Sequence, residues 1–242
     1  SLKPQLHHEI AVGCLHNFKE DLYSLEVETF YKKIKNRVDY IDGADLIPNE
    51  AIEQVVLAGR GRAYGLEVLF RKNSGRLSGW ASYTLSRTEQ QIDGRTPNEP
   101  GINNGRWYRN GYDKMHNLSL VGDYKYNEKW RFGAIFTLQS GQPVRYPIGQ
   151  YQYQGITFPN YGARNENNLP MYHHLDVSAT LTPRKNKGRK WQSEWVFGIY
   201  NIYNRYNYAS LSFRQNKETG SNEALRLSIF GIVPSATYNI KF

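Results

Sequence analysis

The feature that most constrains this chain is an alternation of apolar and polar residues with a period of two, which recurs along almost its whole length. In residues 61–72, for example, every second position is apolar, at Tyr64, Leu66, Val68 and Phe70. Successive side chains of a β-strand point to opposite faces, so this pattern predicts strands with one apolar and one polar face. Helical spacing of apolar residues is scarce, and we therefore predict an all-β fold.

About nine segments show this alternation, the first of them less cleanly than the others. They cover residues 5–18, 22–34, 61–72, 76–87, 116–126, 130–139, 175–182, 195–200 and 232–242. Soluble β-sandwiches produce the same pattern, because their apolar faces meet a second sheet. Outer-membrane barrels produce it as well, with the apolar face toward lipid and the polar face toward the lumen.

Three features favour the barrel. Aromatic residues make up 14% of the chain and cluster near the ends of the predicted strands, as expected for the aromatic girdles at both membrane interfaces. The polar face carries a charge load suited to a wet lumen, namely Glu26, Glu28, Lys32, Glu67, Arg71, Asp123 and Arg131.

The third feature is the alternation of short and long links between the predicted strands. Short links are expected at residues 19–21, 73–75 and 127–128, with a somewhat longer one at 183–189. Long links, predicted to lack strands, are expected at about 35–60, 88–114, 140–170 and 203–227. An up-and-down membrane barrel has short periplasmic turns and long extracellular loops, so the sequence predicts a transmembrane antiparallel barrel.

Nine is an odd number, whereas single-chain bacterial barrels close with an even number of strands. An open spanning sheet would leave backbone groups unpaired in lipid. We therefore expect residues 1–242 to be a C-terminal portion, of about nine strands, of a single larger barrel that further polypeptide completes.

Composition excludes several other classes. The mean hydropathy is −0.69 and no apolar run approaches the roughly 18 residues of a spanning helix. Cys14 is the single cysteine, which excludes an internal disulfide and cysteine-cluster metal sites. The net charge of +9 would suit nucleic acid, phosphate-rich lipid or an anionic ligand. The basic run of residues 184–190 is interpreted as a solvated periplasmic turn, and no nucleic-acid partner is expected.

Several segments resemble TonB-dependent outer-membrane receptors of the Bacteroidetes type. They are Leu2–Gln5, Gly61–Glu67, the turn Arg71–Gly75 with Gly79–Arg87, Tyr146–Gly149, Tyr200–Arg205 and the C-terminal Ser228–Phe242 with its terminal aromatic residue. One departure is Tyr172-His-His-Leu-Asp176, where relatives often have arginine at the place of His174.

The resemblance implies a 22-stranded barrel with an N-terminal plug and a TonB-contacting segment. The plug and the TonB-contacting segment are not among these 242 residues. It implies energised import of a bulky nutrient such as a siderophore, cobalamin, a glycan or a peptide. The implied partners are the remaining barrel strands and plug, TonB, outer-membrane lipid and a surface lipoprotein, and the implied location is the bacterial outer membrane.

The predicted loops 88–114 and 140–170 are rich in aromatic and cationic residues, which suit sugars, catechols or anionic chelates. The candidate ligand-binding residues are Arg106, Trp107, Tyr108, Arg109, Tyr112, Tyr146, Tyr151, Tyr153, Tyr161 and Arg164. The alternative is that these side chains pack the loops on one another.

No catalytic residue, metal site or cofactor is predicted, and the protein is not expected to be an enzyme. Adjacent histidines in a strand, such as His173 and His174, point to opposite faces and cannot chelate locally. Glu26 and Glu28 have no accompanying nucleophile or oxyanion-binding group. Two other functions remain open, a soluble β-sandwich that binds glycans and a small outer-membrane adhesin barrel.

Overall fold

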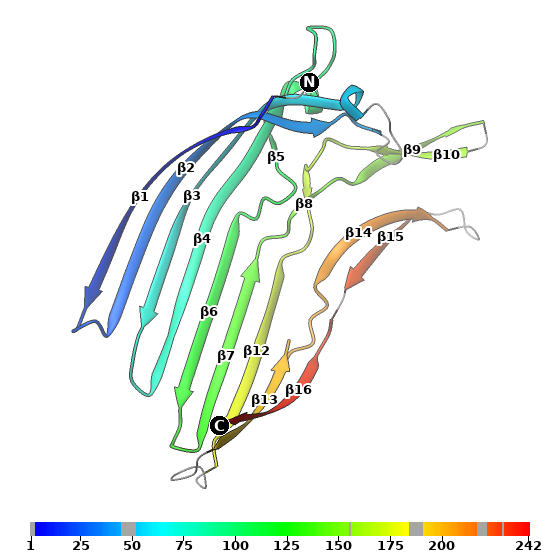
Figure 1. The fold of residues 1–242 in the computed structure, drawn as a ribbon. Helices are drawn as coiled ribbons and strands as arrows, with labels where there is room; N and C mark the ends of the chain where they lie inside the picture. Colours follow the sequence, from blue (N-terminus) through cyan, green and yellow to red (C-terminus); the bar gives the residue numbers. More distant parts are fainter. Residues whose placement is uncertain (1–2, 45–51, 155, 184–190, 217–221, 229) are drawn as a thin grey trace.

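The computed structural model describes residues 3–44, 52–154, 156–183, 191–216, 222–228 and 230–242. Its centre is one curved antiparallel sheet in the order β1-β2-β3-β4-β6-β7-β12-β13-β16 (Figure 1). These strands are Leu6–Phe18, Tyr23–Tyr40, Val56–Lys72, Leu77–Ile92, His116–Lys125, Trp130–Gln139, Tyr172–Leu181, Gln192–Tyr200 and Val233–Lys241. The predicted all-β class, the antiparallel arrangement and the nine main strands are confirmed.

The pairing register assigns each side chain of the sheet to one of two faces. Leu120 lies between Ala81 and Phe136 across neighbouring strands, and these residues belong to what we call the apolar face. Ser119 lies between Ser82 and Thr137 on the opposite side, the polar face. The polar face also carries the charges that the alternation placed there, with Lys32 bound to Glu9 at 3.0 Å.

The apolar face is uncovered in the described part of the chain. Phe70, Phe132 and Phe197 on this face are 39%, 43% and 43% exposed. A sandwich would bury these rings against a second sheet, whereas here a single layer of strands presents them outward. This exposure is what a lipid-facing wall requires.

Aromatic side chains gather on the apolar face at the end of the sheet where the short links lie. The rings of Phe18 and Tyr23 stack at 5.4 Å, and Tyr23 stacks on Phe70 at 5.8 Å. Further along the same rim, the rings of Trp195 and Tyr238 lie 4.6 Å apart. Toward the opposite end, Tyr31 and Tyr64 form a cross-strand pair on the same face.

The long links contain more strand than the alternation predicts. β2 continues to Tyr40 and β3 begins at Val56, so the first long link is much shorter than the predicted 35–60. The sequence pattern breaks because a bulge at Asn36, which has a φ of 56°, shifts the register between Lys35 and Arg37. The inserted residue turns the following side chains to the other face, so a strict period of two fails there.

The long links hold short strands and two 3₁₀ segments, contrary to the prediction that they lack strands. Paired hairpins within them are β9 (Pro147–Tyr153) with β10 (Ile156–Tyr161), β8 (Pro143–Val144) with β11 (Asn167–Asn168), and β14 (Tyr208–Gln215) with β15 (Asn222–Ser228). β5 (Tyr108–Arg109) pairs with β4, and the 3₁₀ segments are η1 (Ile52–Gln54) and η2 (Ile102–Gly105). In these short strands, pairing gives backbone N–H and C=O groups hydrogen-bond partners that they would otherwise find in water. Alternation of apolar and polar residues does not reveal such strands.

Neither of these 3₁₀ segments, nor any other helix among the described residues, is long and apolar enough to cross a membrane.

β1 and β16 form the two edges of the sheet and do not pair with each other in the described part (Figure 1). Almost every residue of β1 and every residue of β16 is exposed. Each edge therefore presents a row of backbone donors and acceptors that could pair with a further strand.

Candidate functional site

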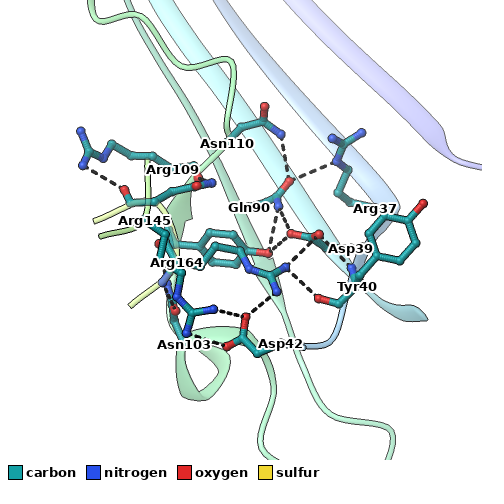
Figure 2. A network of polar contacts seen from close by, with 12 residues as sticks. Arg37, Asp39, Tyr40, Asp42, Gln90, Asn103, Arg109, Asn110, Arg145 and Arg164 are labelled. Atoms are coloured by element: carbon teal, nitrogen blue, oxygen red, sulfur yellow. Dashed lines mark hydrogen bonds and ion pairs between the residues drawn. The ribbon is translucent and has the colours of Figure 1, made fainter. Parts of the chain in front are cut away.

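The bulge at Asn36 turns polar side chains toward the polar face, at the end of the sheet where the long links lie. Beyond the bulge, Arg37 pairs with Gly59 and Asp39 pairs with Leu57, so both side chains turn to the polar face. Gln90 near the end of β4 lies on the same face. Together with residues from the following links, these side chains form what we call the tether network (Figure 2).

Asp39 is the first centre of the tether network. Its Oδ2 atom accepts hydrogen bonds from the Tyr108 hydroxyl at 2.6 Å and from Gln90 Nε2 at 2.6 Å. Gln90 Oε1 accepts in turn from Asn110 Nδ2 at 3.0 Å and from Arg37 Nε at 3.2 Å. Both polar groups of the Gln90 amide are thus hydrogen-bonded, as they need to be because Gln90 is only 4% exposed.

Arg164 is the second centre and ties the distant loop to the end of β2. Its Nη1 lies 3.0 Å from Asp39 Oδ1 and its Nη2 lies 2.5 Å from Asp42 Oδ1. Arg145 from the same loop donates to Asp42 Oδ1 at 2.9 Å. Asn103 of η2 bonds the Arg164 backbone in both directions, at 2.8 and 3.0 Å. Residues more than 100 positions apart are thereby joined.

A small apolar core lies beside the tether network. Leu57, Ile92, Ile102 and the ring of Tyr108 are buried together, and Ile41 packs against them. Leu57 and Ile92 are 1% and 0% exposed, in a sheet whose strands are otherwise largely solvent-accessible. Burial of these side chains and satisfaction of the polar groups around them hold the loop base in one position.

Burial raises the pKa of the Tyr108 hydroxyl well above its usual range, and the hydrogen bond and negative charge of Asp39 add to the shift. Tyr108 therefore stays protonated and acts as a donor. Burial alone would lower the pKa of Arg164, but its hydrogen bond to Asp42 and the charges of Asp39 and Asp42 outweigh that effect and raise it. Two carboxylates meet two arginines in the network, an arrangement suited to holding a loop.

The structure separates the ten predicted ligand-binding residues into groups with different surroundings. Tyr108 and Arg164 belong to the tether network. Arg109 donates to the backbone oxygens of Asn165 at 2.9 Å and of Glu166, and to the side chain of Asn168. These contacts match the alternative in which loop residues pack the loops on one another.

Tyr146 also joins one link to another. Its hydroxyl donates to the Asn168 backbone oxygen at 3.0 Å, and its ring meets Phe213 of β14 edge-on at 5.7 Å. Tyr161 lies beneath the guanidinium of Arg145, 5.5 Å from its ring centroid.

The remaining predicted residues are the accessible ones. Tyr112 is 87% exposed, Tyr151 is 57% exposed and Tyr153 is 62% exposed. Arg106 is exposed as well. Tyr151 stacks on Phe158 across the β9–β10 hairpin with ring centroids 5.5 Å apart, so this hairpin displays a pair of aromatic rings.

Trp107 lies elsewhere, over the arginines of β3 on the apolar face of the sheet. Its ring lies 4.2 Å from the guanidinium carbon of Arg62 and 5.8 Å from that of Arg60. The neighbouring Tyr108 is buried on the polar face, so two consecutive candidates point to opposite sides of the wall. Sequence alone grouped them in one binding loop.

Sequence reasoning missed a cavity of about 440 Å³ on the polar face, between the sheet and the bases of the long links. Its lining includes Lys114, Gln139, Tyr172, His174, Tyr200 and Tyr208. His174 Nδ1 lies 2.8 Å from Asp176 Oδ1, and the hydroxyls of Tyr172 and Tyr200 lie 3.2 Å apart. The departure at His174 is the one signal in the sequence that points toward this cavity.

Two other predictions concern metals and the basic turn. The described residues contain no group of three or more histidine, cysteine, aspartate or glutamate side chains that could hold a metal ion. The basic run 184–190 lies outside the described residues.

No protein-family model matches this sequence, and no curated protein matches it. Solved structures do match its fold. The ferripyoverdine receptor of the Pseudomonas aeruginosa outer membrane is similar with a TM-score of 0.62 and 14% identity, over 99% of this chain and 28% of its own. The ferric-catecholate import receptor Fiu of E. coli gives 0.56 and 16%, over 99% and 28%.

The ferric citrate transporter FecA in its unliganded form gives a TM-score of 0.53 at 15% identity, over 97% of this chain and 30% of its own. This chain therefore spans less than a third of the length of these proteins. At sequence identities this low, the structural similarity establishes a common fold and nothing more. The chain has the fold of a segment of a TonB-dependent outer-membrane receptor barrel.

Proposed function

We propose that this chain forms part of the wall and the extracellular loops of a TonB-dependent transporter that imports a bulky nutrient across the bacterial outer membrane. The observation that carries the proposal is the uncovered apolar face of a nine-stranded antiparallel sheet that matches receptor barrels over nearly its whole length. The long-link end faces outward, since barrels of this class carry long loops on the extracellular side.

We propose a division of labour among the loop residues. The tether network and the contacts of Arg109 and Tyr146 hold the loop bases, while Tyr112, Tyr151, Tyr153 and Arg106 are free to meet a ligand. Aromatic rings and cations suit a flat or anionic ligand such as a catechol, a chelate or a glycan. The cavity lined by Tyr172 and His174 supplies a second contact surface inside the wall.

The proposed partners follow from the open sheet. β1 and β16 pair with further strands that close the barrel, because unpaired edges are prohibitive in lipid. A plug within the lumen and TonB below it complete the transporter, and a surface lipoprotein of the Bacteroidetes type is the proposed partner at the loops. The charged residues of the polar face contact the plug and the water of the lumen. Transport of this kind requires no covalent chemistry from these residues.

Uptake in whole cells tests the proposal. Cells with and without the intact gene would receive three labelled probes separately, a ferric catecholate, ferric citrate and cyanocobalamin. We expect gene-dependent uptake of at least one probe, abolished by a protonophore because the energy comes from the inner membrane. Recovery of the full-length protein in the soluble fraction without detergent, or gene-dependent uptake that a protonophore leaves unchanged, would contradict the proposal.

The soluble glycan-binding sandwich and the small adhesin barrel find less support. A sandwich needs a second layer over Phe70, Phe132 and Phe197, which the described residues do not supply. A small closed barrel needs β1 to pair with β16, and these strands are the two edges of the sheet.

A further inference from the structure

A cluster of four cations lies on the apolar face of the sheet, near the long-link end. Lys33 pairs across the strands with Arg62, and Lys35 pairs with Arg60. Side chains directly opposite each other in neighbouring strands have Cβ atoms about 4.5–5.5 Å apart, and like charges at that distance repel. We call these four residues the outer basic cluster. An arrangement of this kind favours an anion between the side chains.

Within the part of the chain that the structure describes, a single anion meets the outer basic cluster. Arg62 Nη2 lies 2.7 Å from Glu89 Oε2, which neutralises one of the four charges. Arg60 Nε donates to the neutral amide oxygen of Gln91 at 2.9 Å. Within the described residues, no ion pair involves Lys33, Lys35 or Arg60. Among the described residues, three positive charges of the cluster therefore have no counter-charge.

The position of the cluster along the strands is equally informative. Tyr31 and Tyr64 are the cross-strand pair that directly precedes Lys33 and Arg62 on the same face. Toward the short-link end, the same face continues with Leu66, an exposed apolar residue. Two residues of strand span about 6.6 Å, so the cations begin one short step beyond the tyrosine rings. Tyrosines on a lipid-facing wall mark the level of the headgroups.

Trp107 adds a second interfacial element to the cluster. Its ring lies over Arg62 at 4.2 Å and near Arg60 at 5.8 Å, which holds the two guanidinium groups against an amphipathic surface. Arginine stacked on an aromatic ring keeps its N–H donors available at the edge. A planar donor fork at headgroup level matches a phosphate group.

We propose that the outer basic cluster binds the phosphate groups of a lipid in the membrane leaflet around the long-link end. This inference rests on the proposed function, since it requires the apolar face to stand in an outer membrane. An acidic protein or a nucleic acid is the weaker match, because the cluster continues directly into the apolar wall. Its occupant must offer anions and acyl chains side by side.

Titration of the full-length protein in zwitterionic detergent with diphosphoryl lipid A tests the proposal. The triple variant Lys33→Gln, Lys35→Gln, Arg60→Gln removes the uncompensated charges and leaves the Arg62–Glu89 pair intact. The matched control Arg71→Gln, Lys125→Gln, Arg131→Gln removes three charges from the polar face near the short-link end. We expect about tenfold or greater weakening of lipid A binding in the first variant and no change in the second.

Further arms of the titration identify the source of the phosphate. Dephosphorylated lipid A should bind the unmodified protein as weakly as lipid A binds the triple variant. Equal affinity for both lipids, or equal weakening in the control, would overturn the proposal. So would a polyglutamate peptide that binds as tightly as lipid A, or inorganic phosphate that binds the cluster without help from acyl chains.

Separate measurements test the transport proposal and the lipid-binding proposal, so either can fail without the other. Lipid A binding is measured in detergent and does not depend on transport, and the triple variant should retain the uptake of labelled probe. If gene-dependent uptake survives the protonophore but lipid A binding depends on the cluster, the lipid site stands and the transport proposal falls. If uptake is present and lipid A binding ignores the cluster, only the lipid site falls.

Discussion

Two groups of charged residues lie near the long-link end on opposite faces of the sheet, and the chain neutralises their charges to different extents. In the tether network, Asp39 and Asp42 meet Arg164 and Arg145, so the charges are matched within the chain. In the outer basic cluster, three cations have no carboxylate partner among the described residues. Within the described residues, arginines of the chain neutralise both carboxylates of the tether network, whereas three cations of the outer basic cluster are left for the surroundings to neutralise.

The largest change in the free energy of unfolding is expected from a charge placed on the apolar face. Leu120→Lys places a charge on the apolar face at mid-strand, where it should lower the free energy of unfolding by roughly 2–4 kcal/mol in a bilayer. Ser119→Lys is the matched control, since its neighbours Ser82 and Thr137 lie on the polar face. Urea titration in vesicles measures both, and equal costs would mean that the faces are exchanged.

Removal of the centre of the tether network should have the next largest effect. Asp39→Ala leaves the buried Tyr108 hydroxyl without its acceptor and removes one of the two acceptors of Gln90 Nε2, at a cost of about 1–3 kcal/mol. Hydrogen exchange of residues 102–110 and 162–168 should speed up, while exchange in β7 and β12 stays slow. Unchanged exchange in both loop segments would mean that the small apolar core alone holds them.

The salt bridge between Arg62 and Glu89 on the apolar face should have a smaller effect on stability. Glu89→Gln removes the partner of Arg62, whose side chain is partly exposed, and should change the free energy of unfolding by at most about 1 kcal/mol. The same change should strengthen binding of diphosphoryl lipid A, because a fourth cation becomes available. Weaker binding would show that Glu89 positions Arg62 rather than competing for it.

The smallest effect on stability is expected at the exposed tyrosines. Tyr112→Ala and Tyr153→Ala should each leave the free energy of unfolding within about 0.5 kcal/mol, because neither ring is buried. Uptake of the transported probe at low concentration should nevertheless fall. Tyr40→Ala is the control, an exposed tyrosine of β2 outside the candidate ligand-binding loops 88–114 and 140–170, and an equal loss there would argue against specific contact.

Much of the sheet could be predicted from the sequence because each strand keeps one face apolar. A period of two identifies the strands, and the positions of the short links fix their antiparallel order. Prediction failed where the period breaks. The bulge at Asn36 exchanges the two faces within β2, so the pattern could not show that Lys35 and Arg37 point to opposite sides.

The candidate site was harder to predict, because its members come from links that are distant in sequence. Arg164 meets Asp42 across 122 positions, and no local pattern encodes that contact. Trp107 and Tyr108 are adjacent and similar in character, yet one lies over the arginines of the apolar face and the other is buried on the polar face. Residue type alone could propose that both bind ligand, and only pairing with β4 separated them.

The alternation of residue types along the chain is enough to specify amphipathic strands, with an apolar wall, a charged opposite face and aromatic residues near the strand ends. Alternation is a local property that each strand carries alone. Tertiary structure decided which charges are neutralised, which tyrosines remain accessible and where a cavity opens beside His174. Those outcomes depend on register and on contacts between distant links, since a shift of one residue moves a side chain to the other side of the wall.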